Sequence, residues 1–261
     1  MKNFDNHTFV VCAYGESPYL SDCLDSLLSQ TVKSRILIAT ATPNAFIRET
    51  AARYGFPLYE AEKHEGIGQD WNFAMSCTET DYVTVAHQDD IYLPDYVKEI
   101  TKHIDESKRQ LLFFTNYNEF TGERLIDKTR NLKIKRMLTA PLKLFPSSRF
   151  YRRRMLSLGN VIGCPSVTFN TKLTGRTPFV CKMDNDLDWD TWEHFSKEKG
   201  QFVYISRVLM HHRIHEGSGT TAAIKSGLRQ KEDYLMMCKF WPKPIAGLLC
   251  RGYNRSLKTK K

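Results

Sequence analysis

The first hundred residues alternate short apolar runs with segments of helical periodicity, and this alternation constrains the fold more than any other feature. The runs at 8–13, 35–40 and 82–86 are rich in β-branched and aliphatic residues, as buried strands are. Between the first two runs, five residues follow the spacing of one apolar helix face: Leu20, Cys23, Leu24, Leu27 and Leu28. Strands that alternate with helices form βαβ units, so we expect an α/β fold with a mainly parallel central sheet and helices on both faces.

Local signals suggest where some elements begin and end. Ser17 followed by Pro18 predicts a helix N-terminus, and a further helix is expected near Pro94. In the second half, 202–205 has the composition of a strand. The histidine-rich segment 211–215 is expected to open a loop, because glycines follow it.

The chain is basic, with 38 Lys and Arg against 29 Asp and Glu, which gives a net charge of +9 among 261 residues. Such a balance favours anionic partners. Much of the excess lies between 124 and 154, where one acid, Asp127, stands among eleven cations. Aromatic residues interleave there, so single-stranded nucleic acid, a solvated loop and a membrane-facing patch all remain open readings.

Seven cysteines without a CxxC pair argue against a disulfide framework and a zinc ribbon. The N-terminal sequence lacks the apolar stretch of a signal peptide, and no run of about 18 apolar residues is present. These features predict a cytoplasmic protein, soluble or peripheral on the inner face of the plasma membrane.

The segment His87-Gln88-Asp89-Asp90 directly follows the strand at 82–86. In parallel sheets, ligands bind beyond the carboxyl ends of the strands, so these carboxylates are expected at the ligand edge. Adjacent carboxylates there are natural ligands for a hard divalent cation. The alternative is that Asp89 and Asp90 cap the following turn.

A second acidic cluster alternates with other residues: Asp184, Asp186, Asp188 and Asp190. A calcium loop would need glycine at its sixth position and glutamate at its twelfth, where Trp189 and Phe195 stand, so that reading fails. The cluster is expected at a helix N-terminus, where it either serves chemistry or compensates the helix dipole.

Two further segments carry candidate roles. His211, His212 and His215 lack an HExxH pattern, so a hydrogen-bonding or phosphate-contacting role is favoured over zinc. The C-terminal tail combines Phe240, Trp241, Leu248 and Leu249 with cations, which suits either an anchor on anionic lipid or a segment docked on the domain. Prolines at 242 and 244 are expected to prevent a long helix there.

Taken together, these segments resemble the family 2 glycosyltransferases of bacterial type, with the GT-A fold, from about residue 9 to residue 220. Five motifs carry the resemblance, in the family's order: VVCAYGESPYLSDCLDSLLSQT (10–31), GIGQDWNFAM (66–75), HQDD (87–90), LDWDTW (187–192) and VLMHHRIHEGSGT (208–220). HQDD is similar to the metal-binding DxD motif, and LDWDTW to the family's acidic helix start.

The resemblance implies a Rossmann-like GT-A domain over 1–222, with a nucleotide-sugar half at about 1–110 and an acceptor half at about 111–222. A basic helical extension, 223–261, would follow. It also implies an inverting hexosyltransferase that uses a nucleotide sugar, most simply a UDP-sugar. The acceptor would be a hydroxyl of a glycan or a polyprenyl-diphosphate-linked sugar in cell-surface polysaccharide synthesis, with an anionic membrane surface as a further partner.

Residue roles follow from the matched motifs. Asp188 would be the general base, and Mn²⁺ or Mg²⁺ would bind Asp89 with help from Asp90 and His215. Seven residues would line the donor: Tyr14, Glu16, Thr40, Asp70, Asn72, Gln88 and Arg213.

Three positions depart from the family pattern. His87 replaces the first acid of DxD, and Leu187 replaces a glutamate that precedes the general base. Thr40 begins the segment where the family places an Asp that contacts the nucleotide base.

Other functions remain open at this stage. A nucleotidyltransferase would need a basic glycine-rich loop near the first strand, which the segment 12–20 lacks. A nucleic-acid-binding module would need no metal, and its carboxylates at the sheet edge would repel phosphate. An inactive transferase-like protein is the third alternative, because His87 and Thr40 replace expected acids.

Overall fold

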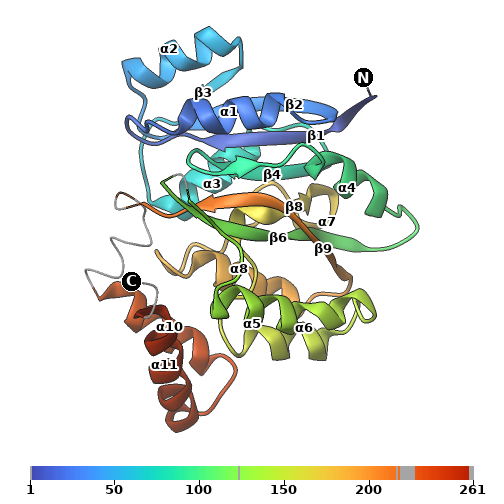
Figure 1. The fold of residues 1–261 in the computed structure, drawn as a ribbon, viewed down its shortest axis with the longest axis vertical. Helices are drawn as coiled ribbons and strands as arrows, with labels where there is room; N and C mark the ends of the chain where they lie inside the picture. Colours follow the sequence, from blue (N-terminus) through green and yellow to red (C-terminus); the bar gives the residue numbers. More distant parts are fainter. Residues whose placement is uncertain (1, 123, 216, 218–226, 259–261) are drawn as a thin grey trace.

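The computed structural model describes residues 2–122, 124–215, 217 and 227–258, apart from the side chains of 255–258. These residues form a nine-stranded sheet with helices on both faces (Figure 1). The strands are β1 (Lys2–Cys12), β2 (Val32–Thr40), β3 (Leu58–Glu60), β4 (Tyr82–His87), β5 (Ile91–Tyr92), β6 (Gln110–Thr121), β7 (Arg124–Ile126), β8 (Val167–Asn170) and β9 (Gln201–Arg213).

Helices alternate with the strands in the first half and gather in the second. The α-helices are α1 (Leu20–Leu28), α2 (Ala45–Tyr54), α3 (Ile67–Ser76), α4 (Tyr96–His103), α5 (Arg130–Thr139), α6 (Arg149–Leu156), α7 (Thr171–Thr174), α8 (Leu187–Ser196), α10 (Leu228–Cys238) and α11 (Lys243–Lys258). Two 3₁₀ helices, η1 (Ala140–Lys143) and η2 (Cys164–Ser166), complete the set of described elements.

The sheet is mixed, and most of its paired residues lie in parallel pairs. Its order is β3-β2-β1-β4-β8-β6-β9-β5, with β7 paired to β6. The strands β3, β2, β1 and β4 are parallel, β8 runs antiparallel to both β4 and β6, and β6 is parallel to β9. The α/β class and the helices on both faces, predicted from the alternating pattern, are confirmed.

Two apolar layers cover the two faces of the sheet. On one face, α1, α2 and α4 pack against β1 through side chains such as Leu24 and Phe9. On the other face, α3, α6 and α8 pack through Trp189, Trp192 and Phe169. Both tryptophans on α8 are fully buried, so the helix that carries Asp188 is fixed against the sheet.

Long-range strand pairing overrides two local predictions. Residues 211–213 belong to β9, not to a loop, because His211 pairs with Asn118 on β6 and with Ile91 on β5. The predicted strand at 202–205 is thus the start of a thirteen-residue strand. Such pairing outweighs a polar composition, since strand preference depends on context.

The predicted helix start, with Ser17 as the cap and Pro18 as the first helical residue, is wrong by two residues. The first helix begins at Leu20, and its N-cap residue Tyr19 makes no side-chain cap bond. The Ser17 hydroxyl instead accepts the Tyr19 N–H at 3.3 Å, in the turn before the helix.

The C-terminal helices dock on the domain. Met236 and Met237 of α10, and Ala246 and Cys250 of α11, are buried in the same core as α8. The Trp241 indole N–H donates to the Ser157 carbonyl at 2.8 Å. The expectation that the prolines prevent a long helix is wrong, because α11 begins at Lys243 and proline is tolerated in a first helical turn. None of the described helices is long and apolar enough to cross a membrane.

An acidic pair is buried where α10 meets α8. Burial, followed by the charge of Asp233, raises the pKa of Asp186 to about 9. Burial also raises the pKa of Asp233 to about 6, although Arg229 opposes this shift. The folded chain therefore holds a proton that the unfolded chain releases, so this pair's contribution to stability falls as pH rises from about 4 to about 9.

We expect Asp233→Asn to flatten this dependence, because the amide removes the charge that repels Asp186. The difference in melting temperature between the variant and the unchanged chain should be more favourable to the variant at pH 8.5 than at pH 5.5. Asp184→Asn, an exposed acid in the neighbouring loop, is the matched control and should change little. An equal shift at both pH values would contradict the prediction.

Candidate active site

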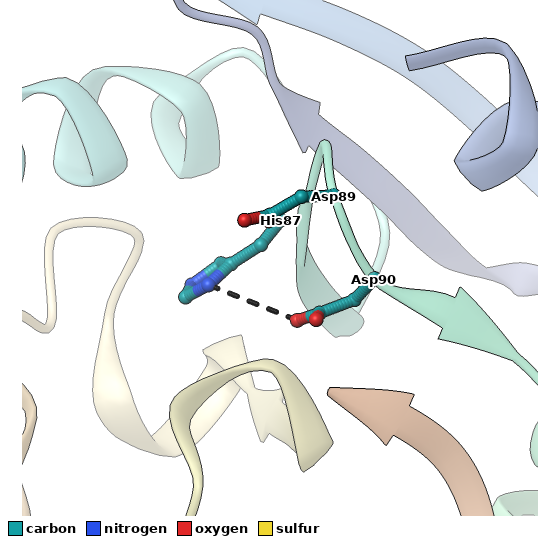
Figure 2. A group of neighbouring side chains, drawn as sticks. All are labelled: His87, Asp89 and Asp90. Carbon is teal, nitrogen blue, oxygen red and sulfur yellow. Dashed lines mark ion pairs between the residues drawn. The ribbon is translucent and has the colours of Figure 1, made fainter. Parts of the chain in front are cut away.

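Three titratable side chains meet where β4 ends. His87 is the last residue of β4, and Asp89 and Asp90 follow in a tight turn closed by the Asp90 N–H and the His87 carbonyl at 3.2 Å. Their ligand atoms all lie within 4.8 Å of one another. Figure 2 shows the His87 imidazole facing the Asp90 carboxylate, 3.9 Å away, with Asp89 beside it.

This group fits a divalent cation. Asp90 is fully buried, yet its Oδ2 and the Nε2 of His87 have no hydrogen-bond partner. An unpaired buried carboxylate oxygen is unfavourable, and a cation would satisfy it. Burial lowers the pKa of His87 despite the opposing charges of Asp90 and Asp89, so a neutral imidazole is available as a ligand. Carboxylate and imidazole together suit Mn²⁺, and the carboxylates suit Mg²⁺.

The last residues of β9 lie against the same turn. Asp90 Oδ1 accepts the Arg213 N–H at 2.9 Å and bonds the His212 Nδ1 at 3.0 Å. Burial acts to lower the pKa of His212, but the charge and hydrogen bond of Asp90, together with the charges of Asp89 and Glu119, outweigh burial, so the pKa is raised. His215 Nε2 lies 2.8 Å from Asp89 Oδ2. The structure thus brings Asp89, Asp90, Arg213 and His215 together, as the motifs predict.

The Arg213 guanidinium is held on several sides. Its Nε donates to the Asp89 carbonyl and its Nη2 to Asp22 on α1, both at 2.9 Å. The aromatic rings of Tyr19 and Phe120 lie 4.2 and 4.7 Å from it. Sequence reasoning missed Asp22, which the i, i+4 helix pattern did not distinguish from any solvated acid. The end of the fifth motif, 216 and 218–220, lies outside the described residues.

The turn after β1 is tied to its neighbours by side-chain amides and hydroxyls. Gln88 both accepts the Tyr14 N–H and donates to the Tyr14 carbonyl, each at 2.9 Å. The Gly15 N–H donates to the Thr42 hydroxyl at 3.2 Å, and Gly15 takes a positive φ of 58°. Glu16 is exposed on this turn. The loops after β1, β2 and β4 therefore form one preorganised edge.

Other predicted donor residues have varied surroundings. Thr40 is buried, and its hydroxyl accepts the Thr42 N–H at 3.0 Å. Asp70 Oδ2 lies 2.6 Å from the His64 Nδ1, and the His64 ring lies 5.8 Å from the Tyr14 ring. His64 therefore lies between Asp70 and Tyr14 and connects the two. The motifs did not indicate His64.

Asn72 is turned into the protein. Its amide donates to the Phe179 carbonyl at 3.0 Å and accepts the Phe179 N–H at 2.9 Å. These bonds join α3 to the segment before α8 and occupy both ends of the amide. The Asn72 amide is therefore bonded to the Phe179 backbone and does not face the open edge of the sheet.

Asp188 lies in the first turn of α8, close to the cation group. Its Oδ2 accepts the Asn160 amide and its Oδ1 accepts the Trp189 N–H, both at 2.8 Å. Burial raises its pKa, while the bonds from Asn160 and Trp189 and the charges of Lys135 and His87 oppose the shift. A carboxylate with a raised pKa is suited to accept a proton near neutral pH.

A residue of α10 fixes the loop before Asp188. The Glu232 carboxylate accepts three consecutive backbone N–H groups, those of Asp184, Asn185 and Asp186, at 3.1, 2.8 and 2.9 Å. The Asp186 N–H, at the N-cap of α8, is a donor that a helix N-terminus leaves unpaired, and the other two belong to the loop before it. A side chain distant in the sequence satisfies all three. Sequence reasoning missed Glu232 and Asn160, because no local pattern links either to Asp188.

Comparison with known sequences gives a consistent family. Residues 8–171 match the family model described as Glycosyl transferase family 2. The uncharacterized glycosyltransferase MJ1057 of Methanocaldococcus jannaschii is 22% identical over 83% of the chain and 73% of its own length. Glycosyltransferase GlyA of Streptococcus pneumoniae is 26% identical over 45% of the chain, a match that spans only 18% of GlyA.

Solved structures share the fold. TarS 1–349 of Staphylococcus aureus superposes with a TM-score of 0.62 at 12% identity, covering 100% of this chain and 73% of TarS 1–349. The mannosyltransferase PcManGT of Pyrobaculum calidifontis, solved with GDP-Man and Mn²⁺, gives 0.63 at 14% identity, covering 95% and 69%. These likenesses confirm the GT-A fold.

We expect Asn72→Ala to destabilise the protein before any ligand is added. The change leaves two backbone groups of Phe179 unsatisfied, which costs about 1–3 kcal/mol. The melting temperature should fall by roughly 2–4 °C per kcal/mol. Gln69→Ala, exposed on the same helix, is the control. An unchanged melting temperature would instead favour a role confined to the donor.

Proposed function

Because the chain belongs to glycosyl transferase family 2, we propose that it transfers a hexosyl group from a nucleotide sugar to an acceptor hydroxyl, with inversion at the anomeric carbon. The observation that carries this proposal is the position of Asp188. This carboxylate with a raised pKa is close enough to His87, a member of the cation group, for their charges to influence each other's protonation. A base and a leaving-group site must lie on opposite sides of the transferred sugar in a single displacement.

Asp188 would take the proton of the attacking hydroxyl onto a carboxylate oxygen. Asn160 and the Trp189 N–H each bond one of its oxygens, which fixes the carboxylate plane and leaves a lone pair on each oxygen. General bases positioned in this way contribute about 10²–10⁴-fold to rates.

His87, Asp89 and Asp90 would hold Mn²⁺ or Mg²⁺. His87 takes the place that the motifs gave to His215 as a ligand, because His215 Nε2 lies against Asp89 Oδ2 at 2.8 Å. When bound, such an ion supplies positive charge that stabilises a diphosphate leaving group. The chain's own contribution is orientation: His212 and Arg213 fix Asp90, and His215 fixes Asp89. PcManGT was solved in complex with GDP-Man and Mn²⁺, which supports this assignment.

The preorganised edge would hold the nucleotide. Tyr14, Glu16 and Gln88 lie on or against the turn after β1, and Asp70 lies across from it through His64. Thr40, at the end of β2, would lie beside the base. TarS was solved with UDP-GlcNAc and PcManGT with GDP-Man, which supports a nucleotide sugar as donor. We infer a UDP-sugar as the first candidate.

The acceptor would be a hydroxyl of a glycan or of a polyprenyl-diphosphate-linked sugar, used in cell-surface polysaccharide synthesis at the cytoplasmic face of the membrane. Support comes from neighbours of Asp188 that belong to the half of the chain after residue 110. Lys135 lies there, donating to the Tyr117 hydroxyl at 2.8 Å and influencing the protonation of Asp188. A cation beside the base suits an anionic acceptor.

The donor is identified by thermal shift with UDP-, GDP- and dTDP-sugars, each with and without Mn²⁺. A ligand at a hundred times its dissociation constant stabilises the folded state by about 2.7 kcal/mol, or roughly 5–10 °C here. We expect one nucleotide to give a metal-dependent shift that Asp89→Ala loses. Glu49→Ala, exposed on α2, should keep it.

No shift with any nucleotide in folded protein would contradict the proposal. It would favour the alternatives, an inactive transferase-like protein or a nucleic-acid-binding module. Salt-sensitive binding of generic oligonucleotides, unaffected by EDTA, would indicate the second of these.

The base is tested by turnover. Asp188→Asn should lower kcat by about 10²–10⁴-fold while the donor-induced thermal shift persists. Asn160→Ala removes a bond that lowers the pKa of Asp188, so the acidic limb of its pH–rate profile should move to higher pH. Unchanged kcat in Asp188→Asn would exclude Asp188 as the base.

A further inference from the structure

The helical segment after β7 exposes an unusual set of large apolar side chains. Met137, Leu144, Phe145 and Phe150 are 66%, 77%, 58% and 71% exposed. Met137 lies on α5 and Phe150 on α6, whereas Leu144 and Phe145 lie in the connection that follows η1 and leads to α6. Scattered exposed apolar residues are ordinary, but a concentration within one segment indicates a contact surface.

Helix spacing places cations on the same face as these apolar groups. On α5, Arg130, Lys133, Ile134 and Met137 recur at i, i+3, i+4 and i+7, and all four are exposed. Leu132 on the opposite face is buried. The outward stripe of α5 is therefore half cationic and half apolar.

The second helix continues this surface. The Tyr151 hydroxyl on α6 donates to the Leu138 carbonyl on α5 at 3.0 Å, so the two helices are in contact. Figure 1 shows them together beneath the sheet. On α6, Arg149, Phe150 and Arg154 are exposed, while Met155 is buried.

The surface is strongly positive. Its exposed cations are Lys128, Arg130, Lys133, Lys143, Arg149 and Arg154. Among the described residues from 124 to 158, Asp127 is the one acid. We call the outward side of α5, of α6 and of the whole connection between them, with these residues, the α5–α6 face.

We propose that the α5–α6 face docks on an anionic phospholipid bilayer. Aliphatic and aromatic side chains interleaved with Lys and Arg match a membrane interface, where apolar groups enter the acyl boundary and cations meet acidic headgroups. Nucleic acid would instead require aromatic platforms for successive bases. Here Ile134, Met137 and Leu144 cannot stack, and the Arg154 guanidinium lies 5.5 Å from the Phe150 ring.

This face replaces the C-terminal tail as the main contact. Trp241 and Leu249, which the sequence indicated as anchor residues, pack against the core. In the tail, Leu248 remains exposed, at 70%. The tail is therefore the alternative membrane contact, and an experiment can distinguish it from the α5–α6 face.

The same helix also reaches the candidate active site. Lys135, on the inward side of α5, bonds Tyr117 and lies close enough to Asp188 to affect its protonation. Docking through α5 would bring the acceptor side near the lipid surface. This last step rests on the proposed function, whereas membrane binding does not.

Vesicle flotation without any sugar nucleotide tests the proposal, so its result is independent of transferase activity. The full chain is mixed with phosphatidylcholine vesicles with or without phosphatidylglycerol, at low and high salt. We expect binding that needs phosphatidylglycerol and weakens with salt. Hydrogen exchange on the unchanged chain should show vesicle-induced protection at 130–156.

Matched variants then locate the contact. Lys133→Gln with Lys143→Gln should weaken binding by about fivefold per cation. Leu144→Ser with Phe150→Ser should weaken it too, while Leu28→Ser with Tyr59→Ser, exposed elsewhere, should not. Melting temperatures verify that each variant is folded.

Three results would overturn the proposal. One is an absence of binding to anionic vesicles, including the case in which the chain binds single-stranded oligonucleotides instead. Another is full binding by the folded α5–α6 variants. The third is loss of binding in Leu248→Ser alone, with protection confined to α11, which would assign the contact to the tail.

Discussion

The candidate site depends on the contact between the Asp90 carboxylate and the end of β9. This carboxylate is fully buried at the end of β4, and one of its oxygens accepts the Arg213 N–H and bonds His212. These bonds hold the end of β9 against the β4–β5 turn, although the two segments are more than 120 residues apart. Arg213 and His215 can then reach Asp89. Breaking this contact would leave a buried charge unpaired, so the strand end and the turn are fixed together.

The parts of the fold that local pattern determines were predictable, and those that long-range pairing determines were not. The runs at 8–13 and 82–86 form buried strands because their apolar residues have no other place in a layered fold. Residues 211–213 are polar, and only their partners on β6 and β5 make them a strand. The sequence motifs therefore indicated which residues meet at the site but not the element that carries them there.

The same distinction applies within the site. Asp89, Asp90 and Asp188 belong to recognisable motifs. In the structure, Asp89 and Asp90 group with His87, and the charge of Asp188 acts on His87. Glu232 has no motif, because its function is to accept three N–H groups from a loop almost fifty residues earlier. The C-terminal helices thus act as a part of the support for Asp188, which their composition alone did not suggest. A tail whose composition suggests a membrane anchor can instead stabilise the loop that carries the site.

Charge is separated across the molecule, and this separation explains how a basic chain can carry an acidic site. Asp22, Asp89, Asp90 and Asp188 gather around the edge of the sheet, whereas the α5–α6 face carries six exposed cations and a single acid, Asp127. A diphosphate brought to the edge alone would meet carboxylates, and Arg213 already pairs with Asp22. An added cation is the simplest way to make that edge attractive to an anion. The α5–α6 face thus contributes part of the net charge of +9, and that net charge says little about the chemistry at the sheet edge.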